Sequence, residues 1–141
     1  MPERTVPRRE LLAYLVGAGV AGTILVAPYV GRPFVLALFP QLKPLALVPF
    51  FVLPLFWGVW NWLRVRRGLR IGIGAWGAVL GFGLACLANG LFVAQGVWFP
   101  AVLLLLVTVP AGYWLLWTFL VGPLNEGLGV EAGTISYTTP S

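Results

Sequence analysis

The sequence predicts an all-α membrane protein, a compact bundle of four transmembrane helices with a short interfacial helix after the first. Of the 141 residues, 60% are hydrophobic and 9% are charged, whereas average soluble domains have about 45–50% and 25%. The mean hydropathy is +0.93. Four uncharged runs of at least 20 residues follow one another along the chain, and about 20 apolar residues form a helix that can cross a bilayer.

The four apolar runs are the predicted spans. Each run is continuous and lacks the alternation of apolar and polar residues that a barrel strand shows, which favours helices. The connections between the runs are too short to fold as separate domains, so residues 1–141 are expected to form one transmembrane domain with a polar tail over 122–141. The predicted spans are Leu11–Val30, Pro44–Leu63, Ile71–Phe92 and Ala101–Val121.

The connection Gly31–Lys43 contains a short apolar stretch between two prolines. Phe34–Phe39 is too short to cross a bilayer. Pro33 suits the first turn of a helix, and Pro40 would end it. We therefore expect a short helix on the membrane surface. The alternative is a partial re-entry into the membrane, which would need shelter from other protein.

Positive charges are distributed unevenly about the spans. Two of the nine, Arg32 and Lys43, lie between the first and second spans. The other seven precede the first span or lie between the second and third: Arg4, Arg8, Arg9, Arg64, Arg66, Arg67 and Arg70. Because Lys and Arg are enriched in cytoplasmic loops, we expect both termini in the cytoplasm and the chain in a bacterial-type inner membrane. Tryptophans near the same ends are interpreted as an aromatic belt: Trp60, Trp62, Trp76, Trp114 and Trp117.

Arginines are concentrated directly after the second span. We interpret them as a membrane-surface anchor, because each Arg near anionic lipid headgroups contributes about 1 kcal/mol of attraction. Arg8 and Arg9 resemble a twin-arginine export signal. The run that follows them is long for the apolar region of a cleaved signal, so the first span is expected to remain. The predicted anchor residues are Arg64, Arg66, Arg67 and Arg70.

The chain lacks most residue types that catalysis and metal binding use. It contains neither Asp nor His and a single cysteine, Cys86, which excludes bis-His haem sites, zinc sites and Ser-His-Asp triads. All four Glu residues lie outside the spans, which disfavours proton-coupled antiport. The positive residues form no continuous stripe that would bind nucleic acid. We expect a protein that is not an enzyme and has no evident cofactor, with contact to a lipid, quinone or pigment left open.

Small residues recur every four positions along the third span. Gly77, Gly81 and Ala85 lead to Asn89, and Gly74 lies alongside. This spacing forms a smooth ridge, which we call the small-residue ridge, where another helix can approach closely. We expect it to pack against the first span or to form an interface with a partner subunit. The matching small residues of the first span are Gly17, Ala18, Ala21 and Gly22.

Few polar side chains lie within the spans, and the roles expected of them differ between two classes of function. The amide of Asn89 is expected to bond another helix or to contact a ligand such as a quinone or pigment. Pro49, Pro54 and Pro110 predict bends, which build ion sites in some transporters. We favour a non-catalytic accessory or structural subunit of a larger membrane complex, of an electron-transfer or photosynthetic kind, whose partners are membrane lipids and larger subunits. The alternative is a small homo-oligomeric channel or transporter.

Overall fold

The computed structural model describes residues 6–98 and 100–130, and within that part it contains helices and no strands. The predicted all-α class is therefore confirmed for the described residues. The longer helices are α1 (Val6–Ile24), α2 (Val26–Leu38), α3 (Val48–Arg67), α4 (Ile73–Ala94) and α5 (Leu105–Leu116). Shorter segments are the 3₁₀ turns η1 (Pro40–Leu45) and η2 (Pro100–Leu104), the π turn η3 (Trp117–Val121) and helix α6 (Gly122–Gly127).

Among the described residues, three helices are long and apolar enough to cross a membrane. They are Val48–Arg67, Ile73–Ala94 and Val102–Gly127. A fourth results if Arg8–Ile24 and Val26–Leu38, which meet at a bend of 42°, count as one span. These helices follow the order of the predicted runs, and they equal them in number only if the bent pair is one span.

The last long helix extends beyond its predicted end at Val121. The Gly122 N–H bonds the Trp117 carbonyl five residues back, which makes the wide π turn η3. This wider turn accommodates Pro123, which would otherwise clash with the preceding turn and end the helix. The predicted polar tail 122–141 therefore begins as helix α6, and its residues 131–141 lie outside the described part.

The predicted first span, Leu11–Val30, is interrupted within its length. Helix α1 ends at Ile24 and α2 begins at Val26. Pro28 has no N–H for the Ile24 carbonyl and its ring would clash there, which explains the bend at this point. Helix α2 then continues through Pro33, so the expected start of a separate surface helix at Pro33 was wrong.

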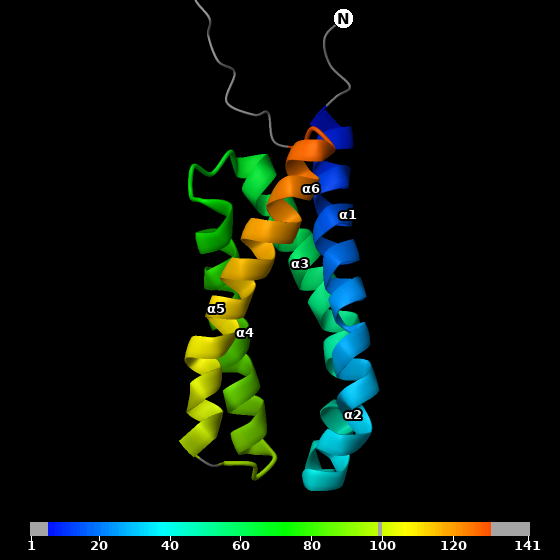
Figure 1. Cartoon of the computed structure of the whole chain (residues 1–141), viewed down its shortest axis with the longest axis vertical. Coiled ribbons are helices and arrows are strands. Elements are labelled where there is room, and N and C mark those ends of the chain that lie inside the picture. The colour runs from blue at the N-terminus through cyan, green and yellow to red at the C-terminus, as the bar shows by residue number, and fades with distance from the viewer. Residues whose placement is uncertain (1–5, 99, 131–141) are drawn as a thin grey trace, which may run out of the picture.

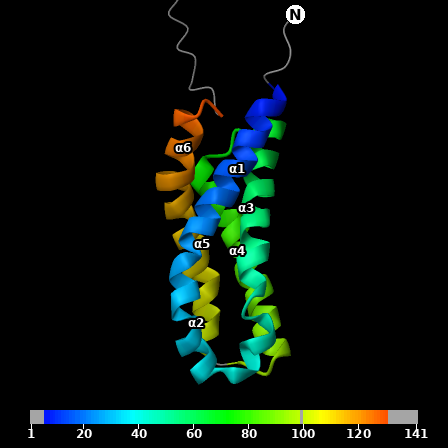
Figure 2. The same cartoon turned by 90° about the vertical axis from the view of Figure 1, so that its right-hand side faces the viewer.

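The helices form two antiparallel hairpins that meet at one end and diverge toward the other (Figure 1). One hairpin pairs α1 with α3, and the other pairs α4 with α5. The start of α1, the α3–α4 connection and α6 lie at the end where the hairpins meet, as both views show (Figures 1 and 2). Helix α2 with η1, and the α4–α5 connection, lie at the opposite end.

The core lies where the two hairpins meet. Trp57 and Trp117 are 2% and 0% exposed, and their rings lie 5.5 Å apart. Tyr113 packs edge-on against Trp57 at 4.9 Å. Trp76 is also buried. The interpretation of Trp76 and Trp117 as interface aromatics was therefore wrong, because tertiary packing takes both into the core.

Candidate functional site: the buried contact between the hairpins

Two asparagines form a reciprocal pair between the hairpins. Asn61 on α3 and Asn125 on α6 are both completely buried. The Asn61 amide donates to the Asn125 Oδ1 at 3.0 Å, and the Asn125 amide donates to the Asn61 Oδ1 at 2.9 Å. Asn61 also donates to the Ala13 carbonyl of α1 at 2.8 Å. One amide pair therefore joins three helices in a region that apolar side chains surround.

Two glycines bring α1 and α3 close enough for Asn61 to reach across. Gly17 lies directly against the Trp57 carbonyl, so a Cβ at this position would collide with the backbone of α3. Gly58 of α3 lies under the ring of Tyr14, where a Cβ would come within 2.6 Å of a ring carbon. Because neither glycine carries a side chain, the two backbones approach closely, and this places the Ala13 carbonyl within reach of the Asn61 amide.

The end of α6 is fixed by a second set of hydrogen bonds. The Val130 N–H donates to the Asn125 carbonyl at 2.8 Å. The Arg9 guanidinium donates twice to the Val130 carbonyl, at 2.8 and 3.3 Å. Gly129 between them has a φ of +67°, a conformation that favours glycine and closes the helix end. The start of α1 thus holds the segment that carries Asn125.

A tryptophan pair makes a second reciprocal contact, between α3 and α4. The Trp60 indole N–H donates to the Trp76 carbonyl at 2.9 Å, and the Trp76 indole N–H donates to the Trp60 carbonyl at 3.0 Å. Their rings stack with centroids 4.4 Å apart and an interplanar angle of 16°. Like the asparagine pair, this contact satisfies its polar groups without water, as a low-dielectric interior requires.

Two core tryptophans lack such partners. Within residues 6–98 and 100–130, the indole N–H groups of Trp57 and Trp117 are buried and make no hydrogen bond. Trp117 begins the π turn η3, and π turns frequently occur at functional sites. The two rings fill the core, where they pack against each other and Trp57 packs against Tyr113.

The small-residue ridge of α4 packs against α5. A Cβ on Gly81 would lie 2.8 Å from the Tyr113 Cβ and 3.1 Å from the Pro110 Cα. Gly77 lies against Trp117, and Gly74 faces Trp114 and Thr118. Ala85 is buried as well. The expected partner helix was wrong, because α5 occupies the ridge while α1 uses its own Gly17 against α3.

Asn89, at the end of the ridge, bonds only within its own helix. Its amide donates to the Ala85 carbonyl at 2.9 Å, and the side chain is half-buried. The expected bond to another helix is therefore not formed by this amide among the described residues. The helix-spanning amides are Asn61 and Asn125 instead. Asn125 was missed because it follows the last apolar run, although Gly122 and Pro123 before it indicate a helix start.

Two residues of the predicted arginine anchor make contacts within the chain. Arg64 donates to the Ile71 carbonyl at 3.1 and 3.4 Å and so closes the α3–α4 connection. The Arg66 guanidinium lies 4.8 Å above the ring of Trp62. Arg67 and Arg70 are exposed. Three of the four therefore remain available at the surface of this end.

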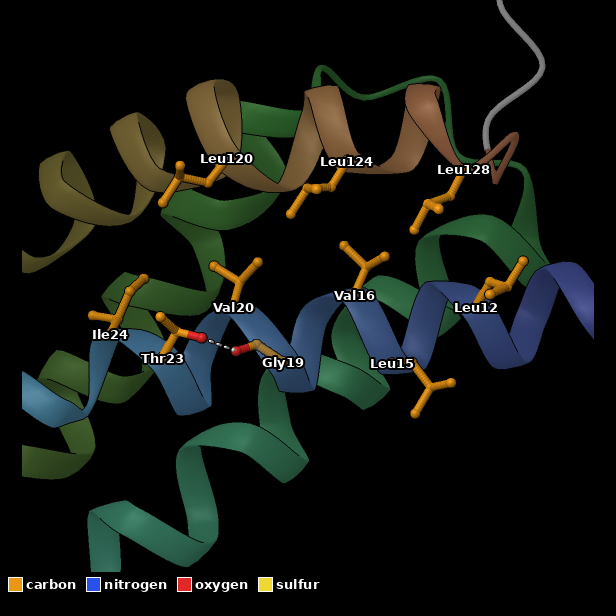
Figure 3. A pocket seen from close by; sticks show the side chains of 10 residues that line it. All are labelled: Leu12, Leu15, Val16, Gly19, Val20, Thr23, Ile24, Leu120, Leu124 and Leu128. Carbon is orange, nitrogen blue, oxygen red and sulfur yellow. Dashed lines mark hydrogen bonds between the residues drawn. The ribbon is translucent and has the colours of Figure 1, made fainter.

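A groove separates α1 from the helix formed by η3 and α6 (Figure 3). Its volume is about 500 Å³. The Thr23 hydroxyl donates to the Gly19 carbonyl at 2.9 Å, so the one hydroxyl of the lining is paired. The other lining side chains are aliphatic: Leu12, Leu15, Val16, Val20, Ile24, Leu120, Leu124 and Leu128.

The contact between the hairpins can therefore hold helices together, and it presents no reactive group. In the described part of the chain, no group of three or more His, Cys, Asp or Glu residues is placed to hold a metal ion. Comparisons with protein-family models, curated proteins and solved structures gave no match.

We expect Gly81→Leu to separate α4 from α5 and to lower stability by about 1–3 kcal/mol, the usual cost of overpacking. Gly83→Leu is the matched control, because a Cβ on Gly83 would meet no atom within 4 Å. Thermal unfolding of the detergent-purified variants measures the difference. If both variants melt at the same temperature, close packing on the small-residue ridge does not stabilise the fold.

Proposed function

We propose that the chain is a four-span membrane protein with a structural task, a non-catalytic accessory subunit that packs against larger membrane-protein subunits. The observation that carries this proposal is the pairing of Asn61 with Asn125. In a channel or transporter, polar groups of the interior face a path for water or solute. Here both buried amides are directed at each other and at the Ala13 carbonyl, so they hold helices rather than line a path.

Helix α2 supplies the surface on which a partner would pack. It has no buried residue, and Phe34 and Leu38 are 76% and 74% exposed. Within the described chain it contacts mainly η1 and α1. Arg32 lies on the same helix, with its guanidinium 5.2 Å from the Tyr29 ring centroid. A partner that packs on α2 would cover these apolar side chains and would face the Arg32 guanidinium.

Native membranes solubilised in a mild detergent test the accessory role. We expect tagged chain to co-purify with larger subunits in a fixed ratio, detected by mass spectrometry. Phe34→Asn with Leu38→Asn should release these subunits. Phe119→Asn, at an exposed position of the π turn η3, is the control. Recovery of the chain alone, or of multiples of the chain alone, would contradict an accessory role and favour the homo-oligomeric alternative.

We expect both termini and the α3–α4 connection to face the cytoplasm. Arg8, Arg9 and the arginines in and after the last turn of α3 belong to the end where the hairpins meet, and Lys43 belongs to the opposite end. In a Cys86→Ala background, a membrane-impermeant thiol reagent applied to intact cells should label Trp98→Cys and leave Gly72→Cys unlabelled. Both positions are exposed, and Gly72 has a negative φ that accepts a side chain. Labelling of Gly72→Cys alone would show that the orientation is the opposite of the one we expect.

A further inference from the structure

The groove between α1 and α6 has the form of a site for one lipid chain. Side chains at four-residue intervals line it from both sides, and those labelled Val16, Val20 and Leu124 point into it (Figure 3). At about 1.5 Å of rise per residue, the stretch from Leu12 to Ile24 is about 18 Å long. One leaflet of a bilayer core is about 15 Å thick. The groove therefore matches a single leaflet in length.

The size of the groove disfavours a transmembrane helix as its occupant. A helix with side chains is about 10–12 Å wide, so an 18 Å length of it fills roughly 1,400 Å³ or more. The groove offers about 500 Å³. A transmembrane helix also crosses both leaflets, whereas the residues of α1 that line the groove extend over the length of one leaflet and end at Ile24. An acyl chain is thin, apolar and as long as one leaflet, and it needs no hydrogen bond from this lining.

A positively charged residue precedes the groove lining on the same face of α1. Arg8 lies one four-residue step before Leu12, so Arg8, Leu12, Val16 and Val20 follow one face of α1. Arg8 is exposed. Arg9 beside it holds the Val130 carbonyl next to Leu128 at the end of the opposite wall. Arg8 and Arg9 thus belong to the end of α1 at which the headgroup of a lipid in the groove would lie.

We propose that this groove binds one acyl chain of an anionic phospholipid, with its phosphate at Arg8. The lipid would fill the space between the hairpins beside the asparagine pair and stabilise their contact. This inference rests on the membrane residence in the proposed function and not on the accessory role. Purified chain without partner subunits is therefore sufficient to test it, and a failure to find partners would leave the lipid site intact.

The test compares phosphatidylglycerol with phosphatidylcholine of the same chain length, added to delipidated protein in detergent. We expect phosphatidylglycerol to be retained in native mass spectra and to raise the melting temperature more than phosphatidylcholine. Arg8→Gln should reduce the preference about fivefold, the effect of one Arg near an anionic headgroup. Leu124→Trp should abolish retention by filling the groove, whereas Leu115→Trp, at an exposed position outside it, should retain the lipid.

A second measurement needs no variant and holds even if Leu124→Trp fails to fold. Phosphatidylglycerol with a photoactivatable group in its acyl chain should attach to peptides that contain Leu12–Ile24 and Leu120–Leu128 in wild-type protein. Attachment spread evenly over all helices, or equal retention of both lipids, would overturn the proposal. Loss of these adducts when the same lipid probe is added to native membranes that retain larger subunits would show that protein occupies the groove instead.

Discussion

Replacement of Gly17 by leucine is expected to force α1 away from α3 and to leave little folded protein. The new side chain would meet the Trp57 carbonyl and the Gly58 Cα, the latter 3.1 Å from the added Cβ. Both obstacles are backbone, which cannot rotate away as a side chain does. Overpacking usually lowers the free energy of unfolding by about 1–3 kcal/mol. We expect Gly17→Leu to lower it by the upper value of this range or more.

Gly22→Leu is the matched control for Gly17→Leu, since it makes the same change one and a half turns further along α1. A Cβ on Gly22 would meet no atom within 4 Å. Thermal unfolding and the yield of monodisperse protein in detergent compare the two variants. If both variants lose stability and yield equally, the cause is an effect of leucine on the insertion of α1 and not the α1–α3 contact.

Replacement of Asn61 by leucine is the second change with a large expected effect. It removes all three hydrogen bonds that join α1, α3 and α6 and leaves the Asn125 amide buried without its partner. A buried polar group without a partner costs roughly 1–3 kcal/mol. We expect a comparable loss of stability in Asn61→Leu, measured by thermal or denaturant unfolding in detergent.

A double variant of the two asparagines tests whether stability depends on the pairing of their amides or on packing alone. Replacing both members of a buried pair by apolar residues of similar size can be nearly neutral. Asn61→Leu with Asn125→Leu should therefore be more stable than either single variant. Asn89→Leu should resemble wild type, because the Asn89 amide bonds only its own helix. If the two single losses simply add in the double variant, the two amides are not coupled.

The apolar runs of the sequence predicted the helices but not which helices meet. The runs Pro44–Leu63 and Ile71–Phe92 correspond closely to α3 and α4, because uninterrupted apolar length decides that structure. The small-residue ridge of α4 was visible as a pattern, but the spacing on one helix carries no information about its neighbour. Its contact with α5 depends on Trp117 and Tyr113 fitting over glycines, which only the tertiary arrangement shows.

The distribution of polar residues along the sequence predicted the spans better than it predicted the residues of the candidate site. Asn125 lies beyond the last apolar run, which is typical of a solvated tail, yet the π turn η3 carries the helix onward and buries it. The bend after Ile24 was missed for a related reason. Hydropathy treats Pro28 as one more uncharged residue, whereas its missing N–H interrupts the helix.

The pairing of Asn61 with Asn125 also bears on how the protein is made. Membrane proteins are synthesised from the N-terminus, so the α1–α3 hairpin is complete before α6 leaves the ribosome. During that interval Asn61 has only the Ala13 carbonyl to bond, and its Oδ1 stays open. Arrival of Asn125 then pairs both amides and joins α6 to a hairpin that was made before it.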